Sequence, residues 1–239
     1  MIVINSKTLS EAYNDLLENL MLGDKVNDTL ELTNVVLNIE KPSLEVIHFP
    51  YRKISENYLM SELKWYWSAD NSVETIGKAA KLWYNITDDG KTSNSAYGYI
   101  LHKKYNYDQL QNVLEVLKND INSRRAILNI SDPQLNKLIT KDLQCTIAIH
   151  FLVRNNKLNM TVYMRSNDIV YGLPYDSIYF MSIQDYLANK LNIEIGSYVH
   201  HATSMHLYKK DIDKFTNHTQ SLTIYEKIKE IIYENKTFK

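Results

Sequence analysis

The spacing of apolar residues predicts mainly helices in the first half of the chain. Residues 8–22 (TLSEAYNDLLENLML) carry apolar side chains at helical spacing and begin at a threonine or a serine that can cap the helix. Residues 29–39 (TLELTNVVLNI) alternate between apolar and polar positions, as a β-strand does. Further helices are predicted over residues 55–67, about 72–84 and about 106–119.

The pattern becomes β-rich after residue 124. RAILNIS, CTIAIHFLVRN and KLNMTVYMRSN read as strands, and residues 155–157 (NNK) predict a hairpin turn between the last two. A long helix is expected from Pro174 to Leu191, then a strand over 196–208 and two short helices. Because helices and strands mix without regular βαβ alternation, we expect an α+β fold with a largely antiparallel or mixed sheet.

Composition narrows the class of protein. Six glycines and four prolines are scattered over 239 residues, with no repeat or linker, so a single domain over 1–239 is expected. The net charge of −1 does not favour a nucleic-acid binder. The N-terminus lacks the pattern of a secretion signal, no stretch approaches the roughly 20 apolar residues of a membrane span, and one cysteine allows no internal disulfide. We expect a cytoplasmic protein.

Several residues could carry chemistry, and each has a plain structural alternative. Cys145 opens a strand, either as a small buried hydrophobe or as a nucleophile activated by nearby arginines. Glu62 lies in a helix with few polar neighbours, where it points to water or, if buried, could move protons. His206 and Tyr208 alternate on one strand face and could be a simple polar pair.

Two pairs of residues suit a phosphate. Arg165-Ser166 and Arg124-Arg125 could be a solvated turn and a basic strand entry, but together they offer planar guanidinium groups and a hydroxyl. Among the motifs of the sequence there is no metal-ligand cluster, no P-loop and no dinucleotide fingerprint, so no metal is expected.

These pieces occur in one order: helix Glu, Tyr-Gly, Ser-Arg-Arg, Cys, Arg-Ser-x-Asp, Gly-Leu-Pro, His-x-Tyr. That order resembles the thymidylate synthase family from about residue 55 to residue 210, most specifically in NSRR, the cysteine strand and MRSNDIVYGLPYD. The resemblance is closer to the deoxycytidylate hydroxymethylase branch of bacteriophages, on Cys145-Thr146, RSND, SELKWYW, KLW and SAYG. A phage-encoded protein would act in the host cytoplasm.

The resemblance implies a homodimer packed sheet to sheet and 5,10-methylenetetrahydrofolate as co-substrate. It implies that Cys145 attacks C6 of a pyrimidine, that Glu62 organises water and moves protons, and that Tyr97 supports proton abstraction at C5. Most of the remaining expected contacts are to the nucleotide: Arg165 and Ser166 to its phosphate, Arg124 and Arg125 to the phosphate bound by the neighbouring subunit, and His206 and Tyr208 to the sugar 3′-hydroxyl. Asp168 is expected to contact both the nucleotide and the folate, near the folate pocket.

Two segments depart from the thymidylate synthase pattern. The N-terminal loop GDKVNDTLEL has no arginine for the phosphate, so Lys25 is the expected substitute, as a point charge without the guanidinium fork. The C-terminus ENKTFK lacks the small apolar ending that closes over folate in thymidylate synthases.

Asp176 follows the turn marked by Gly172 and Pro174, and it could simply cap the next helix. Thymidylate synthases have Asn here, which matches the N3–H donor and O4 acceptor of uracil. Cytosine shows the reverse order, which a protonated carboxyl matches, so Asp176 is interpreted as a cytosine selector. The expected activity is deoxycytidylate 5-hydroxymethyltransferase. The alternatives are a CMP hydroxymethylase, a dCMP methylase, a thymidylate synthase, and a catalytically silent homologue that binds nucleotide or RNA.

Overall fold

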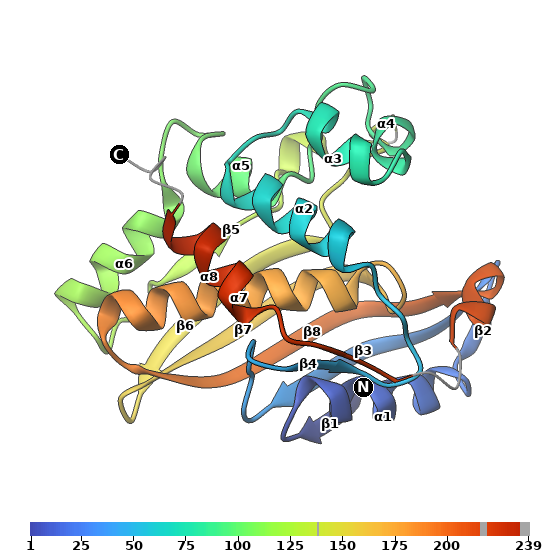
Figure 1. The fold of residues 1–239 in the computed structure, drawn as a ribbon, viewed down its shortest axis with the longest axis horizontal. Coiled ribbons are helices and arrows are strands. Elements are labelled where there is room, and N and C mark those ends of the chain that lie inside the picture. The colour runs from blue at the N-terminus through green and yellow to red at the C-terminus, as the bar shows by residue number, and fades with distance from the viewer. Residues whose placement is uncertain (138, 216–218, 235–239) are drawn as a thin grey trace.

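The computed structural model describes residues 1–137, 139–215 and 219–234 of the chain. Helices cover one face of a seven-stranded sheet of order β1-β3-β8-β7-β6-β5, with β2 paired to β3 (Figure 1). β1 pairs with β3, and β7 with β8, in parallel, while the other pairs are antiparallel, so the sheet is mixed. The α+β fold with a mixed sheet and flanking helices is therefore confirmed.

The elements have the following bounds. The strands are β1 (Ile2–Ser6), β2 (Asp24–Val26), β3 (Thr29–Ile39), β4 (Ile47–Phe49), β5 (Ile127–Asn129), β6 (Thr146–Arg154), β7 (Lys157–Asp168), β8 (Glu194–Tyr208) and β9 (Gln220–Leu222). The helices are α1 (Leu9–Leu20), α2 (Glu56–Trp67), α3 (Val73–Ala79), α4 (Leu82–Ile86), α5 (Tyr97–His102), α6 (Gln109–Asn119), α7 (Leu173–Leu191) and α8 (Tyr225–Glu234), with 3₁₀ turns η1 (Pro133–Leu135) and η2 (Lys209–Lys214).

Helix α7 is the central helix of the molecule. Its side chains are buried on nearly every side, against β7 and β8 beneath it and α6 and α8 beside it (Figure 1). A helix that is apolar all round belongs in the interior, and this one carries the Gly-Leu-Pro turn at its first residues. The packing therefore holds the start of α7 in a fixed place at one end of the sheet.

Local sequence signals identified several boundaries correctly. Thr8 caps α1 in a reciprocal capping box with Glu11. Asn155 and Asn156 both have positive φ, of 52° and 59°, as a tight hairpin between β6 and β7 requires.

The single helix expected over 72–84 is wrong, because the chain breaks between α3 and α4. The break allows Trp83 to bury its ring edge-on against Trp65, with centroids 5.0 Å apart. The helix expected over 106–119 begins only at Gln109, capped by Asp108.

The Tyr-Gly pair has a packing reason. A Cβ on Gly98 would lie 1.6 Å from the backbone oxygen of Tyr66, so only glycine lets α5 approach α2 this closely. That approach buries Tyr97 and stacks its ring on Tyr66, with centroids 5.2 Å apart.

Candidate active site

The parallel pairing of β7 and β8, two central strands of the sheet, brings polar residues together at their carboxyl ends. The register sets Ser166 beside Ser204 and Asp168 beside His206. Cys145 joins them, because the backbone N–H of Arg165 donates to its carbonyl oxygen at 2.9 Å. This end of the sheet therefore carries six of the predicted site residues: Cys145, Arg165, Ser166, Asp168, His206 and Tyr208.

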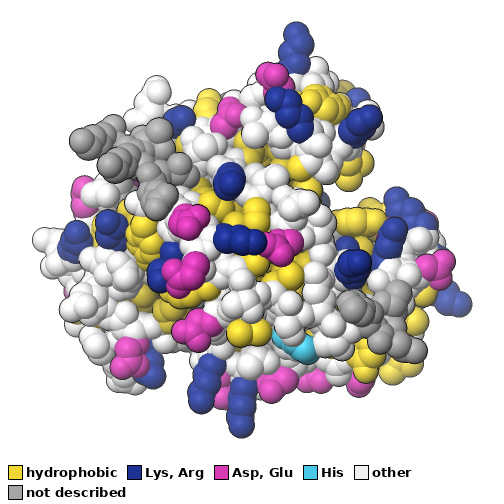
Figure 2. Space-filling view, in the orientation of Figure 1, with side chains coloured by type: hydrophobic (Ala, Val, Ile, Leu, Met, Phe, Trp, Pro, Cys, Tyr) yellow, Lys and Arg dark blue, Asp and Glu magenta, His cyan; other side chains and the backbone are white. Residues whose placement is uncertain are grey.

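This end of the sheet lies where α7 begins. It has α3 and α4 on one side and β2 and η2 on the other (Figure 1). Figure 2 shows the surface hollowed between these two lobes, with hydrophobic side chains on both sides of the hollow. Such a lining suits flat, partly apolar ligands.

Cys145 is partly buried beside the guanidinium of Arg165, whose Nη2 lies 3.6 Å from the thiol Sγ. Burial raises the pKa of the Cys145 thiol, and the positive charge of Arg165 opposes that rise. Arg165 also donates to the carbonyls of Leu143 and Gln144, at 2.8 and 2.9 Å. One side chain therefore both holds the loop before β6 and supplies the charge that favours a thiolate.

Ser166, His206 and Tyr208 form a polar group next to this cysteine. The hydroxyl of Ser166 lies 3.5 Å from Nδ1 of His206, and the ring of His206 meets that of Tyr208 edge to face at 5.3 Å. Burial lowers the pKa of His206, which keeps the imidazole neutral near pH 7. A neutral imidazole and a phenol are suited to hydrogen bonds with hydroxyl groups.

Asp168 starts the turn that leads into α7. Its Oδ1 accepts hydrogen bonds from the backbone N–H groups of Val170 and Tyr171, at 2.6 and 2.9 Å. The carboxylate thus stabilises the turn by accepting backbone hydrogen bonds from the residues that follow it, as in an Asx-turn.

Asp176 lies in the first turn of α7 but does not cap the helix. The N-cap is Gly172, and Asp176 donates its backbone N–H to the carbonyl of Gly172, so the capping interpretation is wrong. The carboxyl Oδ2 instead accepts from Nδ2 of Asn167 at 2.9 Å. Burial raises the pKa of Asp176 to about 7, against the lowering effect of that hydrogen bond. The side chain is therefore partly protonated at neutral pH.

Glu62 is buried on α2, where it accepts a hydrogen bond from the hydroxyl of Tyr58 at 2.7 Å. The indole N–H of Trp83 in turn donates to Tyr58 at 3.0 Å. Burial raises the pKa of Glu62 to about 8; the Tyr58 hydrogen bond lowers it and the charge of Asp176 raises it. Two carboxyl groups that interact and titrate near neutrality in one site can exchange protons with a ligand.

Tyr97 is buried and accepts a hydrogen bond from the hydroxyl of Thr146 at 3.0 Å. Burial raises the pKa of Tyr97 well above its ordinary value, and the charges of Asp176 and Cys145 raise it further. It is a neutral phenol next to the acidic groups.

Arg124 and Arg125 lie away from this group. The backbone N–H of Phe151 donates to Ala126, which sets Arg125 near Leu152 on β6. Leu152 is seven positions from Cys145 along the chain, a distance of roughly 20 Å at about 3.3 Å per residue. Both arginines are exposed, so they cannot reach the cysteine of their own chain.

Lys25 lies on the short edge strand β2. It pairs with Leu30, which pairs with Leu207, so it is two strands away from the His206–Tyr208 segment. Its side chain is exposed, and β2 lies beside η2 at that end of the molecule (Figure 1).

Sequence analysis missed two residues of the site. Tyr58 could have been found, because it precedes Glu62 by four positions in a helix and so lies on the same face. Asn167 carries no comparable signal, since its partner Asp176 is reached only through the turn after β7.

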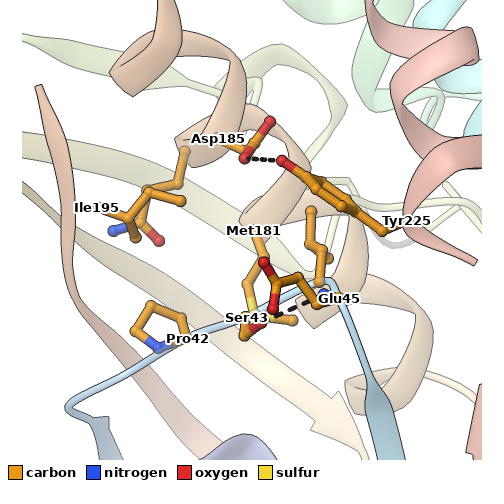
Figure 3. Close-up of a pocket in the computed structure, with 9 residues that line it drawn as sticks. Pro42, Ser43, Glu45, Met181, Asp185, Ile195 and Tyr225 are labelled. Carbon is orange, nitrogen blue, oxygen red and sulfur yellow. Dashed lines mark hydrogen bonds between the residues drawn. The ribbon is translucent and has the colours of Figure 1, made fainter. Parts of the chain in front are cut away.

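A separate cavity of about 240 Å³ opens at the middle of α7 (Figure 3). It is lined by residues of the loop after β3, of α7, and of β8 and α8, among them Glu45, Asp185 and Tyr225, and the hydroxyl of Tyr225 donates to Asp185 at 2.9 Å. None of the predicted site residues lines it.

Within the described ranges, no group of three or more His, Cys, Asp or Glu residues is placed to hold a metal ion. No helix in the same ranges is long and apolar enough to cross a membrane. Of the C-terminal segment ENKTFK, residues 235–239 lie outside the described residues.

Comparison with known proteins identifies the class that this fold and site define. The family model described as thymidylate synthase matches residues 24–233. The chain belongs to the thymidylate synthase family. A solved thymidylate synthase A from Bacillus subtilis shares the fold, with a TM-score of 0.69 at 24% identity, over 86% of this chain and 81% of that one.

Named relatives differ in activity. A Methanocaldococcus jannaschii protein provisionally named a thymidylate synthase is 28% identical, over 89% of this chain and 94% of its own. Deoxycytidylate 5-hydroxymethyltransferase of Enterobacteria phage T4 is 30% identical, over 68% of this chain and 71% of its own. Deoxyuridylate hydroxymethyltransferase of Bacillus phage SP01 is 27% identical, over 84% of this chain and 57% of its own. The family is thus established, and the base and product are open to argument from the site.

Proposed function

We propose that this chain is a deoxycytidylate 5-hydroxymethyltransferase, a one-carbon transferase that acts on dCMP with 5,10-methylenetetrahydrofolate as co-substrate. The observation that carries the proposal is Asp176, a carboxyl at the start of α7 whose pKa is raised to about 7 by burial. The charge of Asp176 raises the pKa of Glu62 and that of Cys145, which supports a role for the three groups in one site.

Cys145 is the proposed nucleophile. Its thiolate adds to C6 of the pyrimidine and pushes electrons toward N3 and the C4 substituent. Arg165 stabilises the thiolate at 3.6 Å, and its remaining N–H groups, with the hydroxyl of Ser166, are suited to the nucleotide phosphate. Lys25 would add a further positive charge from β2, while His206 and Tyr208 bind the sugar hydroxyl.

Asp176 is the proposed partner of the base. A protonated carboxyl donates to N3 of cytosine and accepts from its N4 amino group, and the contact with N3 strengthens as negative charge develops on the ring. Asp176 is half-buried and not fully enclosed, which is compatible with contact to a base. Its raised pKa supplies the protonated form at neutral pH.

The co-substrate supplies the one-carbon unit to C5 when bound, and the apolar sides of the hollow fit its flat ring system. Tyr97 is the proposed support for removal of the C5 proton. Glu62 is the proposed group that orders water and delivers or accepts protons, and its hydrogen bond from Tyr58, which Trp83 supports in turn, is consistent with that role. Addition of water to the exocyclic methylene gives the hydroxymethyl product and returns tetrahydrofolate without oxidation.

The proposal includes a homodimer, and the position of Arg124 and Arg125 supports it. They lie roughly 20 Å along β6 from the cysteine of their own chain, so a phosphate contact requires a second copy. The sheet face away from the helices carries a row of residues across four strands, namely Val36, His201, Tyr163 and Ala148. Tyr163 is 39% exposed there, and a second sheet packed on this face would cover it.

The deciding experiment is incubation of the purified protein with methylenetetrahydrofolate and dCMP, CMP or dUMP in turn, followed by mass analysis of the nucleotide. Addition of CH₂O to dCMP supports the proposal, whereas addition of CH₂ indicates a methylase. Preferred turnover of dUMP or CMP would assign another base or sugar, and no turnover of any nucleotide would leave a binding protein. Asp176→Asn should shift preference from dCMP toward dUMP.

A further inference from the structure

A protonated carboxyl does not by itself distinguish cytosine from uracil. With the proton on one oxygen it presents a donor to N3 and an acceptor to the C4 substituent, which matches cytosine. With the proton on the other oxygen it presents the reverse order, which matches the N3–H and O4 of uracil. Selection by Asp176 therefore requires something that decides which oxygen carries the proton.

Asn167 is placed to make that decision. Its side chain is only 2% exposed, and its Nδ2 donates to Oδ2 of Asp176 at 2.9 Å. An oxygen that accepts an N–H is favoured as the carbonyl oxygen of a carboxylic acid, so the proton is directed to Oδ1. When Asp176 is ionised, its carboxylate can only accept hydrogen bonds. The NH₂ group of Asn167 must then face it, which keeps the amide in the same orientation.

The turn before α7 makes room for this amide. A Cβ on Gly172 would lie 2.6 Å from Nδ2 of Asn167, so the glycine of the Gly-Leu-Pro turn is what makes room for the amide. The amide Oδ1 of Asn167 is buried with no hydrogen-bond partner among the described residues. The orientation of the amide is therefore set by its contact with Asp176.

We propose that Asn167 is a specificity-determining positioning residue. With Oδ1 of Asp176 facing N3 of the base and Oδ2 facing its C4 substituent, the proton that Asn167 fixes on Oδ1 makes Asp176 a cytosine selector. The inference rests on the proposed function, because it concerns the same base contact. It explains why an acid at position 176 could serve cytosine with one neighbour and tolerate uracil with another.

The test compares wild type with Asn167→Leu, which has a similar volume and no donor. The measurement is tritium release from C5-labelled dCMP and dUMP, reported as the ratio of the two kcat/KM values. The ratio should fall about tenfold, the size expected for one hydrogen bond to a carboxyl group, because dCMP turnover falls while dUMP turnover is retained or rises. Asn167→Ser, whose hydroxyl is too short to reach Oδ2, should give the same shift if the leucine variant does not fold.

Asn159→Leu is the matched control. It removes an amide from the other end of β7, where Asn159 accepts from the backbone N–H of Ser197 at 3.0 Å. Its ratio should equal that of wild type even if stability falls. A double-mutant cycle of Asn167→Leu with Asp176→Asn should be non-additive in the logarithm of the ratio, because the two side chains act as a pair.

Two failures are distinguishable. If wild type prefers dCMP and both activities fall together in Asn167→Leu with the ratio unchanged, Asn167 is only structural and the inference is overturned. If wild type prefers dUMP, the proposed function fails as well, and the inference falls with it.

Discussion

The hydroxyl of Tyr58 donates to Oε1 of Glu62 at 2.7 Å while it accepts the indole N–H of Trp83 at 3.0 Å. One oxygen of Glu62 is thereby held by the Tyr58 hydroxyl, which is itself held by the indole of Trp83. A carboxyl that must exchange protons with water or a nucleotide keeps its other oxygen for that purpose.

Tyr58→Phe removes this support without changing the size of the ring. We expect kcat for dCMP to fall about tenfold or more with KM nearly unchanged, because Glu62 would be misplaced rather than lost. The pKa of Glu62 should rise further, since the lost hydrogen bond favours its ionised form. Steady-state kinetics over a pH series measure both effects.

The control for this change is Tyr225→Phe. It removes a tyrosine–carboxyl hydrogen bond of 2.9 Å to Asp185, outside the ligand hollow. Its kinetic constants should match wild type, and an equal loss of kcat in both variants would show that the Tyr58 effect is one of stability.

Cys145 gives a second prediction. It is the only cysteine in the chain, so alkylation by iodoacetamide reports on one thiol. Cys145→Ser should abolish turnover, because a hydroxyl is a far weaker nucleophile at neutral pH, and should leave nucleotide binding nearly intact. Retention of even a tenth of the wild-type rate would reject Cys145 as the nucleophile.

The alkylation rate should depend on Arg165. Replacing it by Met keeps the length of the side chain and removes the charge that opposes the raised pKa of the thiol. Alkylation at pH 8 should become several-fold slower. Lys227→Met removes a positive charge that is paired with Glu56 on the surface, and its rate should be that of wild type.

A third prediction concerns the pH dependence of base recognition. The contact with cytosine needs the protonated form of Asp176, whose pKa is about 7, so kcat/KM for dCMP should fall as pH rises above that value. The groups that act on Asp176 or feel its charge are Glu62, Tyr66, Tyr97, Cys145, Asp168 and Tyr198.

Of these groups, Glu62 titrates closest to the same range, with a pKa of about 8. The Asp176→Asn variant separates the two, because its dUMP turnover should lose the limb near pH 7 and retain the one that belongs to Glu62. A limb near pH 7 that persists in the variant would belong to another group.

A fourth prediction concerns stability. The raised pKa values mean that Glu62 and Asp176 bind more protons in the folded chain than in the unfolded one, where their ordinary values are 4.5 and 3.8. The free energy of unfolding should therefore decrease as pH rises from about 4 through about 8. Glu62→Gln and Asp176→Asn do not titrate, so each should be more stable than wild type at pH 9, by on the order of 2 kcal/mol.

Chemical denaturation at pH 5 and pH 9 checks the prediction. Glu115→Gln on the exposed face of α6 is the control, since it should leave the pH dependence unchanged. A variant at position 62 or 176 that is equally destabilised at both pH values would contradict it.

Local patterns predicted those parts of the fold that local forces decide. The capping box at Thr8, the Asn155-Asn156 hairpin and the alternation of β3 follow from neighbouring residues, and each is present. The break before Trp83 was missed because it depends on a ring packed against Trp65, from a different helix. The strand β1 was also missed, since its partner β3 lies more than twenty residues later.

The candidate site divides in the same way. Burial of Glu62 was an open question in the sequence, and it was decided by the packing of α2. The contact between Asn167 and Asp176 depends on the turn geometry that joins β7 to α7, which no residue spacing reveals. Sequence could place residue types in order, but the distances between them are set by the tertiary fold.

The parallel junction of β7 and β8 has a consequence for how specificity can change. On the proposed assignment, phosphate and sugar are held by backbone-anchored positions of two adjacent strands, while the base meets only the first turn of a helix and the amide beside it. The phosphate and the sugar are thus recognised at the ends of β7 and β8, and the base by Asp176 on α7 together with Asn167, which also lies on β7. A lineage could exchange one base for another through two side chains, Asn167 and Asp176, while its grip on the rest of the nucleotide stayed intact.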